Sequence, residues 1–182
     1  MTDTATRIRA TALELFASRG FEQTSLREIA DQVGLTKASL YYHYPSKQAL
    51  LLAIVAPLVD DTRPVVDAAE RLAPTPANVR LVLTRQLDTM LRQQAVCGLL
   101  IRDAPAMITV LAPMWDEMHR LHTRLHTWLA GTDPTPTDRV RAMAALETLS
   151  VALKATAQLP TIDDHELRTT LLDAALAVLG HP

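Results

Sequence analysis

The sequence predicts an all-helical protein, and its composition supports this in three ways. Hydrophobic residues make up 48% of the 182 residues but aromatic residues only 4%, so the core is built mainly from Leu, Ala, Val and Met. Ala, Leu and Met favour helices, whereas strands favour β-branched and aromatic residues. The chain has only five glycines, and no alternation of apolar and polar residues is long enough to suggest a pair of strands.

The first fifty residues predict three short helices with clear end signals. Ser25 and Glu28 have the spacing of a capping box, Gly34 suits the end of the second helix, and Thr36 is a good N-cap for the third. A tight glycine-containing turn between the last two helices is typical of a helix-turn-helix unit, which we place in residues 1–46. The expected helices are Ala5–Arg19, Leu26–Val33 and Lys37–Tyr44.

Residues 47–182 predict a larger helical domain divided by prolines. Pro57 and Pro64 are expected to kink or end the helix that begins at Lys47, and Pro105 and Pro113 are expected to break a later stretch. The further expected helices are about Ala77–Gln94, a short piece around Cys97–Ile101, Met114–Leu129, Asp138–Gln158 and Asp164–Leu179.

Charge and cysteine content narrow the class of protein only slightly. The net charge is −2, and residues 1–50 carry six Lys or Arg against five Asp or Glu, so charge alone does not indicate a nucleic-acid partner. Cys97 is the single cysteine, which excludes an intrachain disulfide. No apolar stretch approaches the ~20 residues that span a membrane, and the N-terminus does not resemble a signal peptide. We expect a cytoplasmic protein with no membrane partner.

The third expected helix carries groups that suit DNA. Leu40 is expected to face a core of Phe16, Ile29 and Val33, which leaves the other side chains of this helix outside. Hydroxyl, imidazole and ammonium groups bind phosphates, and aromatic rings contact thymine methyls. Lys47 at the start of the next helix is expected to hold a phosphate together with the free N–H groups of that helix.

The runs FEQTSLREIA and VGLTKASLYYHY, together with Lys47, resemble the DNA-binding domain of the tetracycline-repressor (TetR) family. The chain departs mildly from the family pattern, with Thr36 for Ser, Ala38 for Gly and Tyr44 for Phe. Two alternatives stay open: Tyr41 as a packing residue, and Thr36 as a cap alone. The expected DNA-binding residues are Thr24, Ser25, Arg27, Thr36, Lys37, Ala38, Ser39, Tyr41, Tyr42, His43 and Lys47.

The last two expected helices are apolar on most sides, which predicts that a second copy of the chain covers them. The resemblance likewise implies a homodimer joined through its last two helices, with reading helices ~34 Å apart on a palindromic operator. A central core helix within a monomer is the alternative. The expected interface residues are Leu146, Leu149, Leu153, Leu171, Leu172, Ala175 and Leu179.

The resemblance also implies a small-molecule pocket in the C-terminal domain, for an effector that we expect to be largely apolar. Flexible methionines suit such a pocket, although ordinary core packing explains them equally well. The candidates are Met90, Cys97, Met107, Met114, Trp115, Met118, His119 and His122.

Metal, redox and catalytic roles find little support. His119, His122 and His126 share one helix face, but the outer two are ~10 Å apart along the axis, too far to share one tetrahedral ion. Cys97 in an apolar context is more typical of a buried side chain than of a redox sensor. We expect no cofactor, no metal and no enzyme. The favoured function is a ligand-responsive repressor; an activator, or a helical scaffold whose helix-turn-helix is not functional, are the alternatives.

Overall fold

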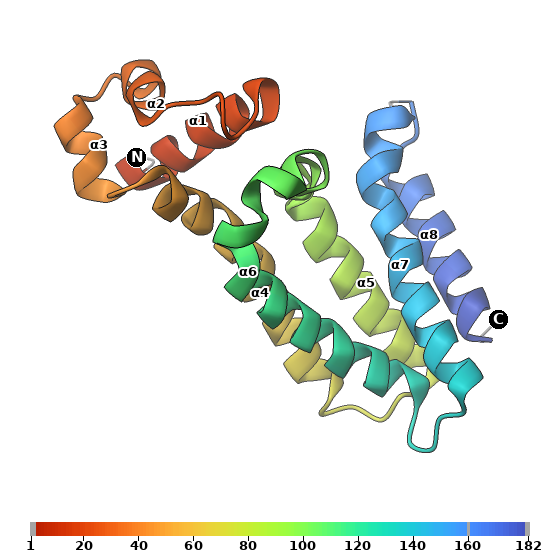
Figure 1. The fold of residues 1–182 in the computed structure, drawn as a ribbon. Helices are drawn as coiled ribbons and strands as arrows, with labels where there is room; N and C mark the ends of the chain where they lie inside the picture. Colours follow the sequence, from red (N-terminus) through yellow and green to blue (C-terminus); the bar gives the residue numbers. More distant parts are fainter. Residues whose placement is uncertain (1–2, 160, 181–182) are drawn as a thin grey trace. The chain divides into compact units, whose positions relative to one another are not determined.

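The computed structural model describes residues 3–159 and 161–180, which form eight α-helices and no strand (Figure 1). This confirms the predicted all-helical class. No helix within these residues is both long and apolar enough to cross a membrane. The helices are α1 (Thr4–Arg19), α2 (Leu26–Val33), α3 (Lys37–His43), α4 (Lys47–Ala69), α5 (Pro76–Arg92), α6 (Gln94–Ala130), α7 (Pro136–Gln158) and α8 (Asp164–Leu179).

The helices group into two compact units. The first contains the chain up to Pro57 together with Ala95–Trp115, and the second contains Leu58–Gln94 and the residues from Asp116 onward. This grouping differs from the expected division at residue 46, because α4 and α6 each contribute residues to both units.

In the first unit, α2 packs against both α1 and α3 (Figure 1). Phe16 is fully buried, and its ring meets the ring of Phe21 edge-on with centroids 5.2 Å apart. Ile29 of α2 and Leu40 of α3 are also fully buried. One apolar residue or more from each short helix therefore reaches a shared core, as the sequence pattern predicted.

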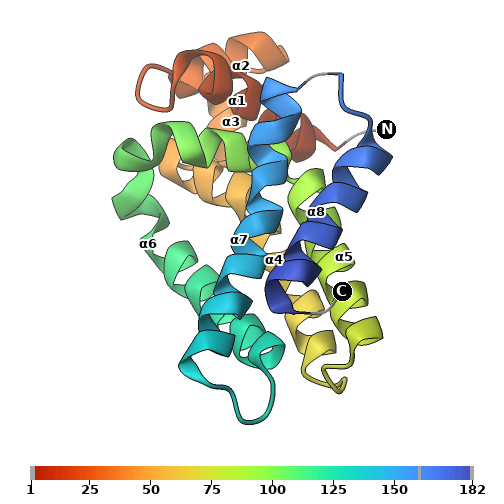
Figure 2. The ribbon, with the colours of Figure 1, turned by 90° about the vertical axis from the view of Figure 1, so that its right-hand side faces the viewer.

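In the second unit, α7 and α8 lie side by side and both contact α5 (Figure 2). This packing corrects the predicted dimer interface. Two of its seven residues, Leu153 and Leu179, are half-buried, and the other five are buried within the chain itself. An apolar helix can be covered by helices of its own chain, so its composition alone did not identify a surface for a partner. The five buried residues are Leu146, Leu149, Leu171, Leu172 and Ala175.

The predicted proline breaks are mostly wrong. α4 continues through Pro57 and Pro64, and α6 continues through Pro113. The predicted break near Pro105 is present as a kink two residues earlier, at Asp103, whose φ of −110° and ψ of 16° are non-helical. Proline has no N–H to donate to the carbonyl four residues before it, which weakens the helix at this point.

Candidate nucleic-acid interface

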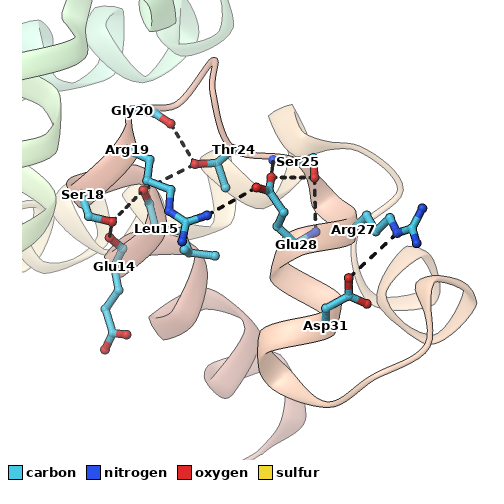
Figure 3. Close-up of polar contacts among 10 residues, drawn as sticks. All are labelled: Glu14, Leu15, Ser18, Arg19, Gly20, Thr24, Ser25, Arg27, Glu28 and Asp31. Carbon is cyan, nitrogen blue, oxygen red and sulfur yellow. Dashed lines mark hydrogen bonds and ion pairs between the residues drawn. The ribbon is translucent and has the colours of Figure 1, made fainter.

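The N-terminus of α2 is fixed by the predicted capping box (Figure 3). The Glu28 amide donates to Ser25 Oγ at 3.2 Å, and the Ser25 amide donates to Glu28 Oε2 at 2.8 Å. Hydrogen bonds to the Ser25 backbone and then to its side chain hold the pKa of Glu28 below its usual value, so the carboxylate stays charged. Ser25, although a member of this box, and the neighbouring Arg27 are both exposed, as a DNA-contacting role requires.

The turn between α2 and α3 follows the predicted chemistry. Gly34 adopts the left-handed conformation, with φ 75° and ψ 34°, and is therefore suited to glycine. The Ser39 amide donates to Thr36 Oγ1 at 3.1 Å, so Thr36 is a true N-cap. Its hydroxyl also lies 2.9 Å from Ser39 Oγ. Thr36 thus has a structural role, and its exposed position leaves a contact with DNA open as a proposal.

Helix α3 presents almost its whole surface to solvent, because Leu40 is its one buried residue. Tyr42 is 88% exposed, and its ring meets the ring of His43 edge-on with centroids 5.7 Å apart. Tyr41 is also exposed, and the Lys37 ammonium lies 5.5 Å from the centre of its ring. Ala38 and Ser39 are exposed and His43 is half-buried, so every predicted α3 contact is accessible.

Tyr44, the departure from Phe in the family pattern, is accommodated by α1. The residue is buried, and its hydroxyl donates to the Ala5 carbonyl at 3.4 Å. The same hydroxyl accepts a hydrogen bond from Arg9 at 3.3 Å. The added oxygen is therefore satisfied where α3 ends.

Two predicted contact residues are engaged inside the protein. The Thr24 side chain is 1% exposed, and its hydroxyl lies 2.9 Å from the Gly20 carbonyl, which accepts its hydrogen (Figure 3). Its side chain therefore stabilises the connection between α1 and α2 rather than reaching out. The Lys47 ammonium donates to the carbonyls of Phe21 at 2.8 Å and Glu22 at 3.2 Å. One of its three N–H groups remains for a phosphate.

An open groove of about 500 Å³ joins these features on one side of the first unit. Arg27, Lys37 and Lys47 give it three positive charges against the single negative charge of Glu22. The first N–H groups of α2 and α4 have no intrahelical partner, and they carry the positive end of each helix dipole. The groove is therefore suited to the phosphates of a DNA backbone. Its lining is Glu22–Arg27, Lys37, Tyr41 and Pro45–Gln48.

The groove also contains polar residues that the sequence analysis did not select, namely Gln23, Ser46 and Gln48. Ser46 caps α4, since its Oγ accepts a hydrogen bond from the Ala49 amide at 3.0 Å. Each of the three is an N-cap or lies within two residues of one, Ser25 or Ser46. Adjacency to an N-cap was the signal that could have identified them.

The predicted effector residues are distributed over both units. Met107 and Met114 are buried in the first unit, whereas Met90, Met118 and the exposed His119 belong to the second. Two cavities within the second unit, of about 580 and 300 Å³, are lined by other residues. The effector site therefore stays a prediction. Its remaining candidates are the half-buried Cys97 and His122 and the exposed Trp115.

The histidines and the cysteine have environments that favour neutral side chains. Burial, followed by the nearby His126, lowers the pKa of His122, and burial also lowers the pKa of His126. Burial raises the pKa of the Cys97 thiol to about 11, so the reactive thiolate is scarce near neutral pH. Within the described residues, no group of three His, Cys, Asp or Glu side chains is arranged to hold a metal ion.

The helix-turn-helix segment is similar to known regulators. Residues 8–54 match the family model described as bacterial regulatory proteins, tetR family. The HTH-type transcriptional regulator RutR of Escherichia coli (strain K12) is 32% identical over 108 residues, which cover 57% of this chain and 51% of RutR. The HTH-type transcriptional repressor KstR2 of Rhodococcus jostii is 42% identical over 50 residues, which cover 28% of this chain and 24% of KstR2. The chain thus spans about half or less of the length of these curated relatives.

The fold of the whole chain is similar to that of solved regulators. The crystal structure of Mycobacterium smegmatis AmtR has a TM-score of 0.79 and covers 98% of this chain and 87% of its own. The identity is 22%, so this similarity concerns the fold alone. Three observations indicate the same helix-turn-helix segment: the capped second helix, the exposed third helix and the family match over residues 8–54. Residues 8–54 therefore form a helix-turn-helix segment of the kind found in the tetR family of bacterial regulatory proteins.

Proposed function

We propose that the chain is a transcriptional repressor that binds a palindromic operator as a homodimer and is released by a small molecule. The observation that carries this proposal is the exposed face of α3 beside the positively charged groove. An operator would place phosphates against the N-termini of α2 and α4, and base edges against Tyr42, His43 and Ser39. The name of KstR2 as a repressor supports repression over activation.

The homodimer is proposed to form through the exposed side of α7. Val140, Met143 and Val151 are spaced so that they lie on one side of the helix, and all three are exposed, Val140 to 64%. Exposed apolar side chains in a row mark a surface for a protein partner. A two-fold dimer uses the same surface of both copies, so one such row on each chain can form the interface. This row replaces the five buried residues of the predicted interface.

The effector is proposed to be largely apolar and to carry a hydrogen-bond donor. Gln86 of α5 is buried, and its Oε1 has no hydrogen-bond partner within the described residues. A buried carbonyl oxygen without a partner raises the free energy of the folded state. A donor group on an effector would satisfy this oxygen, while methionines such as Met90 contact its apolar part.

Selection of binding sites from random duplex DNA tests the proposal. We expect wild-type protein to select a palindrome and to protect two half-sites about one helical turn apart. Tyr42→Ala and Lys37→Ala should each weaken operator binding by about 5- to 150-fold, the range for a lost base or phosphate contact. Lys37→Ala should also reduce the dependence of log Kd on log salt concentration by about one.

Arg71→Ala is the matched control, since it also removes one exposed positive charge but from the second unit. Its operator affinity should equal that of the wild type. Unchanged affinity in both α3 variants would contradict the assignment of α3 as the reading helix. Failure of the wild type to select any sequence would contradict DNA binding itself.

A further inference from the structure

The connection between α1 and α2 is bound by side chains from three separate parts of the sequence. The Gly20 carbonyl accepts from the Thr24 hydroxyl (Figure 3), and the Phe21 carbonyl accepts from the Lys47 ammonium of α4. The Phe21 amide donates to Asp103 Oδ2 of α6 at 3.0 Å. A loop of this length has few backbone groups, so these contacts determine its path.

Arg102 binds the end of α1 that leads into this loop. Its guanidinium donates to the backbone carbonyls of Phe16 and Ala17, which belong to the last turn of α1. The last carbonyls of a helix carry the negative end of its dipole, and the Phe16 carbonyl here also accepts a hydrogen bond from the Gly20 amide. A guanidinium with five N–H donors in a fixed fork can satisfy both carbonyls while it holds a carboxylate. That carboxylate is Asp103, 3.2 Å away.

Asp103 can reach the loop because the α6 backbone departs from the helix at this residue. Its φ of −110° and ψ of 16° are the non-helical values within α6. On the other side of the contact, Gly20 has a φ of 95°, where side chains other than hydrogen are strained. A Cβ at Gly20 would lie 3.6 Å from Asp103 Oδ2. The positive φ of Gly20, rather than a lack of space beside Asp103, therefore favours glycine here.

The charge of Asp103 is stabilised at this place. A hydrogen bond from Arg102, followed by the bond from the Phe21 amide, holds the pKa of Asp103 below its usual value. The side chain is 17% exposed, so water competes little for the carboxylate. Asp103 is therefore an ionised acceptor throughout the neutral pH range.

We propose that Arg102 and Asp103 are positioning residues for DNA binding: they clamp the α1–α2 loop and so hold the groove in its binding shape. The proposal rests on the proposed function. Phe21 connects the clamp to the groove, because Asp103 binds its N–H and Lys47 binds its carbonyl. Lys47 lines the groove, as do the residues that directly follow Phe21. Loss of the clamp would release this wall of the groove without removing any of its side chains.

Four variants and one control test the clamp, with the selected operator as the DNA probe. Asp103→Ala and Arg102→Ala should weaken operator binding by about 5- to 150-fold, the usual range for coupling between two sites. Asp103→Asn keeps an acceptor oxygen for the Phe21 amide, and Arg102→Lys keeps a positive charge, so both should lose less. Arg120→Ala is the matched control: Arg120 also pairs with a carboxylate of α6, Glu117, but binds no backbone carbonyl among the residues that the structure describes. Its affinity should be unchanged.

Hydrogen exchange of the Phe21 amide provides a second readout, independent of DNA. Asp103→Ala should accelerate this exchange at least tenfold while far-UV circular dichroism shows the helices intact, and Arg120→Ala should not change it. If Asp103→Ala does not fold, the same comparison is made with Asp103→Asn.

Wild-type operator affinity in a variant whose Phe21 amide exchanges rapidly would overturn the positioning role. Unchanged Phe21 exchange in Asp103→Ala would overturn the clamp itself. Absence of DNA binding by the wild-type protein is a distinguishable outcome, because it contradicts the proposed function while the exchange experiment still reports on the clamp.

Discussion

Helices α4 and α6 each contain two prolines, but their backbones respond differently. α4 is helical from Lys47 to Ala69, through Pro57 and Pro64. α6 tolerates Pro113 in the same way, yet it has a non-helical residue just before Pro105. An interior proline destabilises an isolated helix by about 3 kcal/mol. Since only one of the four prolines lies next to a kink, contacts with the rest of the chain must determine where a kink forms.

In α4 the buried residues form one continuous stripe along the helix, and the prolines lie off it. Pro57 is half-buried and Pro64 is exposed, so the carbonyls that lose their partners can be hydrated. In α6, by contrast, the kinked residue itself binds the α1–α2 loop. In these two helices, the backbone departs from the helix near a proline only where the departing residue forms another contact, as Asp103 does with the α1–α2 loop. The α4 stripe is Leu50, Leu51, Ile54, Val55, Leu58, Val59, Thr62, Val65, Val66 and Ala69.

The largest expected effect tests the buried stripe of α4. Leu51 is fully buried, whereas its neighbour Leu52 is 40% exposed. Leu51→Ala should lower the free energy of unfolding by about 2–5 kcal/mol, and Leu52→Ala by less than about 1 kcal/mol. Urea-induced unfolding measures both. Equal losses would mean that the stripe is not what holds α4 together across its prolines.

A smaller effect is expected from replacing the prolines. Pro64→Ala restores an amide that can donate to the Asp60 carbonyl, and should raise the free energy of unfolding by about 1–2 kcal/mol after the entropy gained by the unfolded chain. Pro105→Ala should leave the kink in place, because the clamp remains. Hydrogen exchange separates the two: the new amide at 64 should be protected and the new amide at 105 should exchange rapidly. Protection at 105 would show that proline alone causes the kink.

The smallest expected effect is on the stability of the protein at acidic pH. The folded pKa of Asp103 lies below its ordinary value of 3.8, chiefly because of the Arg102 hydrogen bond. Its contribution to stability is thus complete only well above pH 3.8 and is lost as the pH falls through the lower folded value. Asp103→Asn should remove this contribution, less than about 1 kcal/mol, and flatten the stability curve below pH 4.

Thermal melts from pH 2 to pH 7 measure this dependence. Asp116→Asn, which changes an exposed carboxylate of the same helix, is the matched control. An equal change of the acid dependence in both variants would contradict the clamp as its source.

Local sequence signals predicted the parts of the fold that local chemistry determines. The predicted bounds of α2 and α8 agree with the structure. Ser25 and Gly34 are end signals that act within a few residues, and Gly180, which the sequence analysis did not use, ends α8 in the same way. The fate of Pro57 and Pro64 could not be predicted, since it depends on which side of α4 the rest of the chain buries.

The candidate site divides in the same way. The exposure of α3 followed from the single apolar position at Leu40. The hydrogen bonds of Lys47 could not be predicted from the sequence. Its acceptors are backbone carbonyls more than twenty residues away, and any residue type provides a carbonyl. The clamp at Arg102 was invisible for the same reason: its partners in α1 are also backbone carbonyls.

The densely bonded α1–α2 loop also limits where the chain can change its length. An inserted residue between Gly20 and Thr24 would displace acceptors for Thr24, Lys47 and Asp103 at once. The connection at residues 131–134, between α6 and α7, has exposed positions at Thr132 and Asp133 and can lengthen at little entropic cost. A fluorophore or affinity tag is therefore best inserted there, and natural insertions in related chains should accumulate there rather than next to α2.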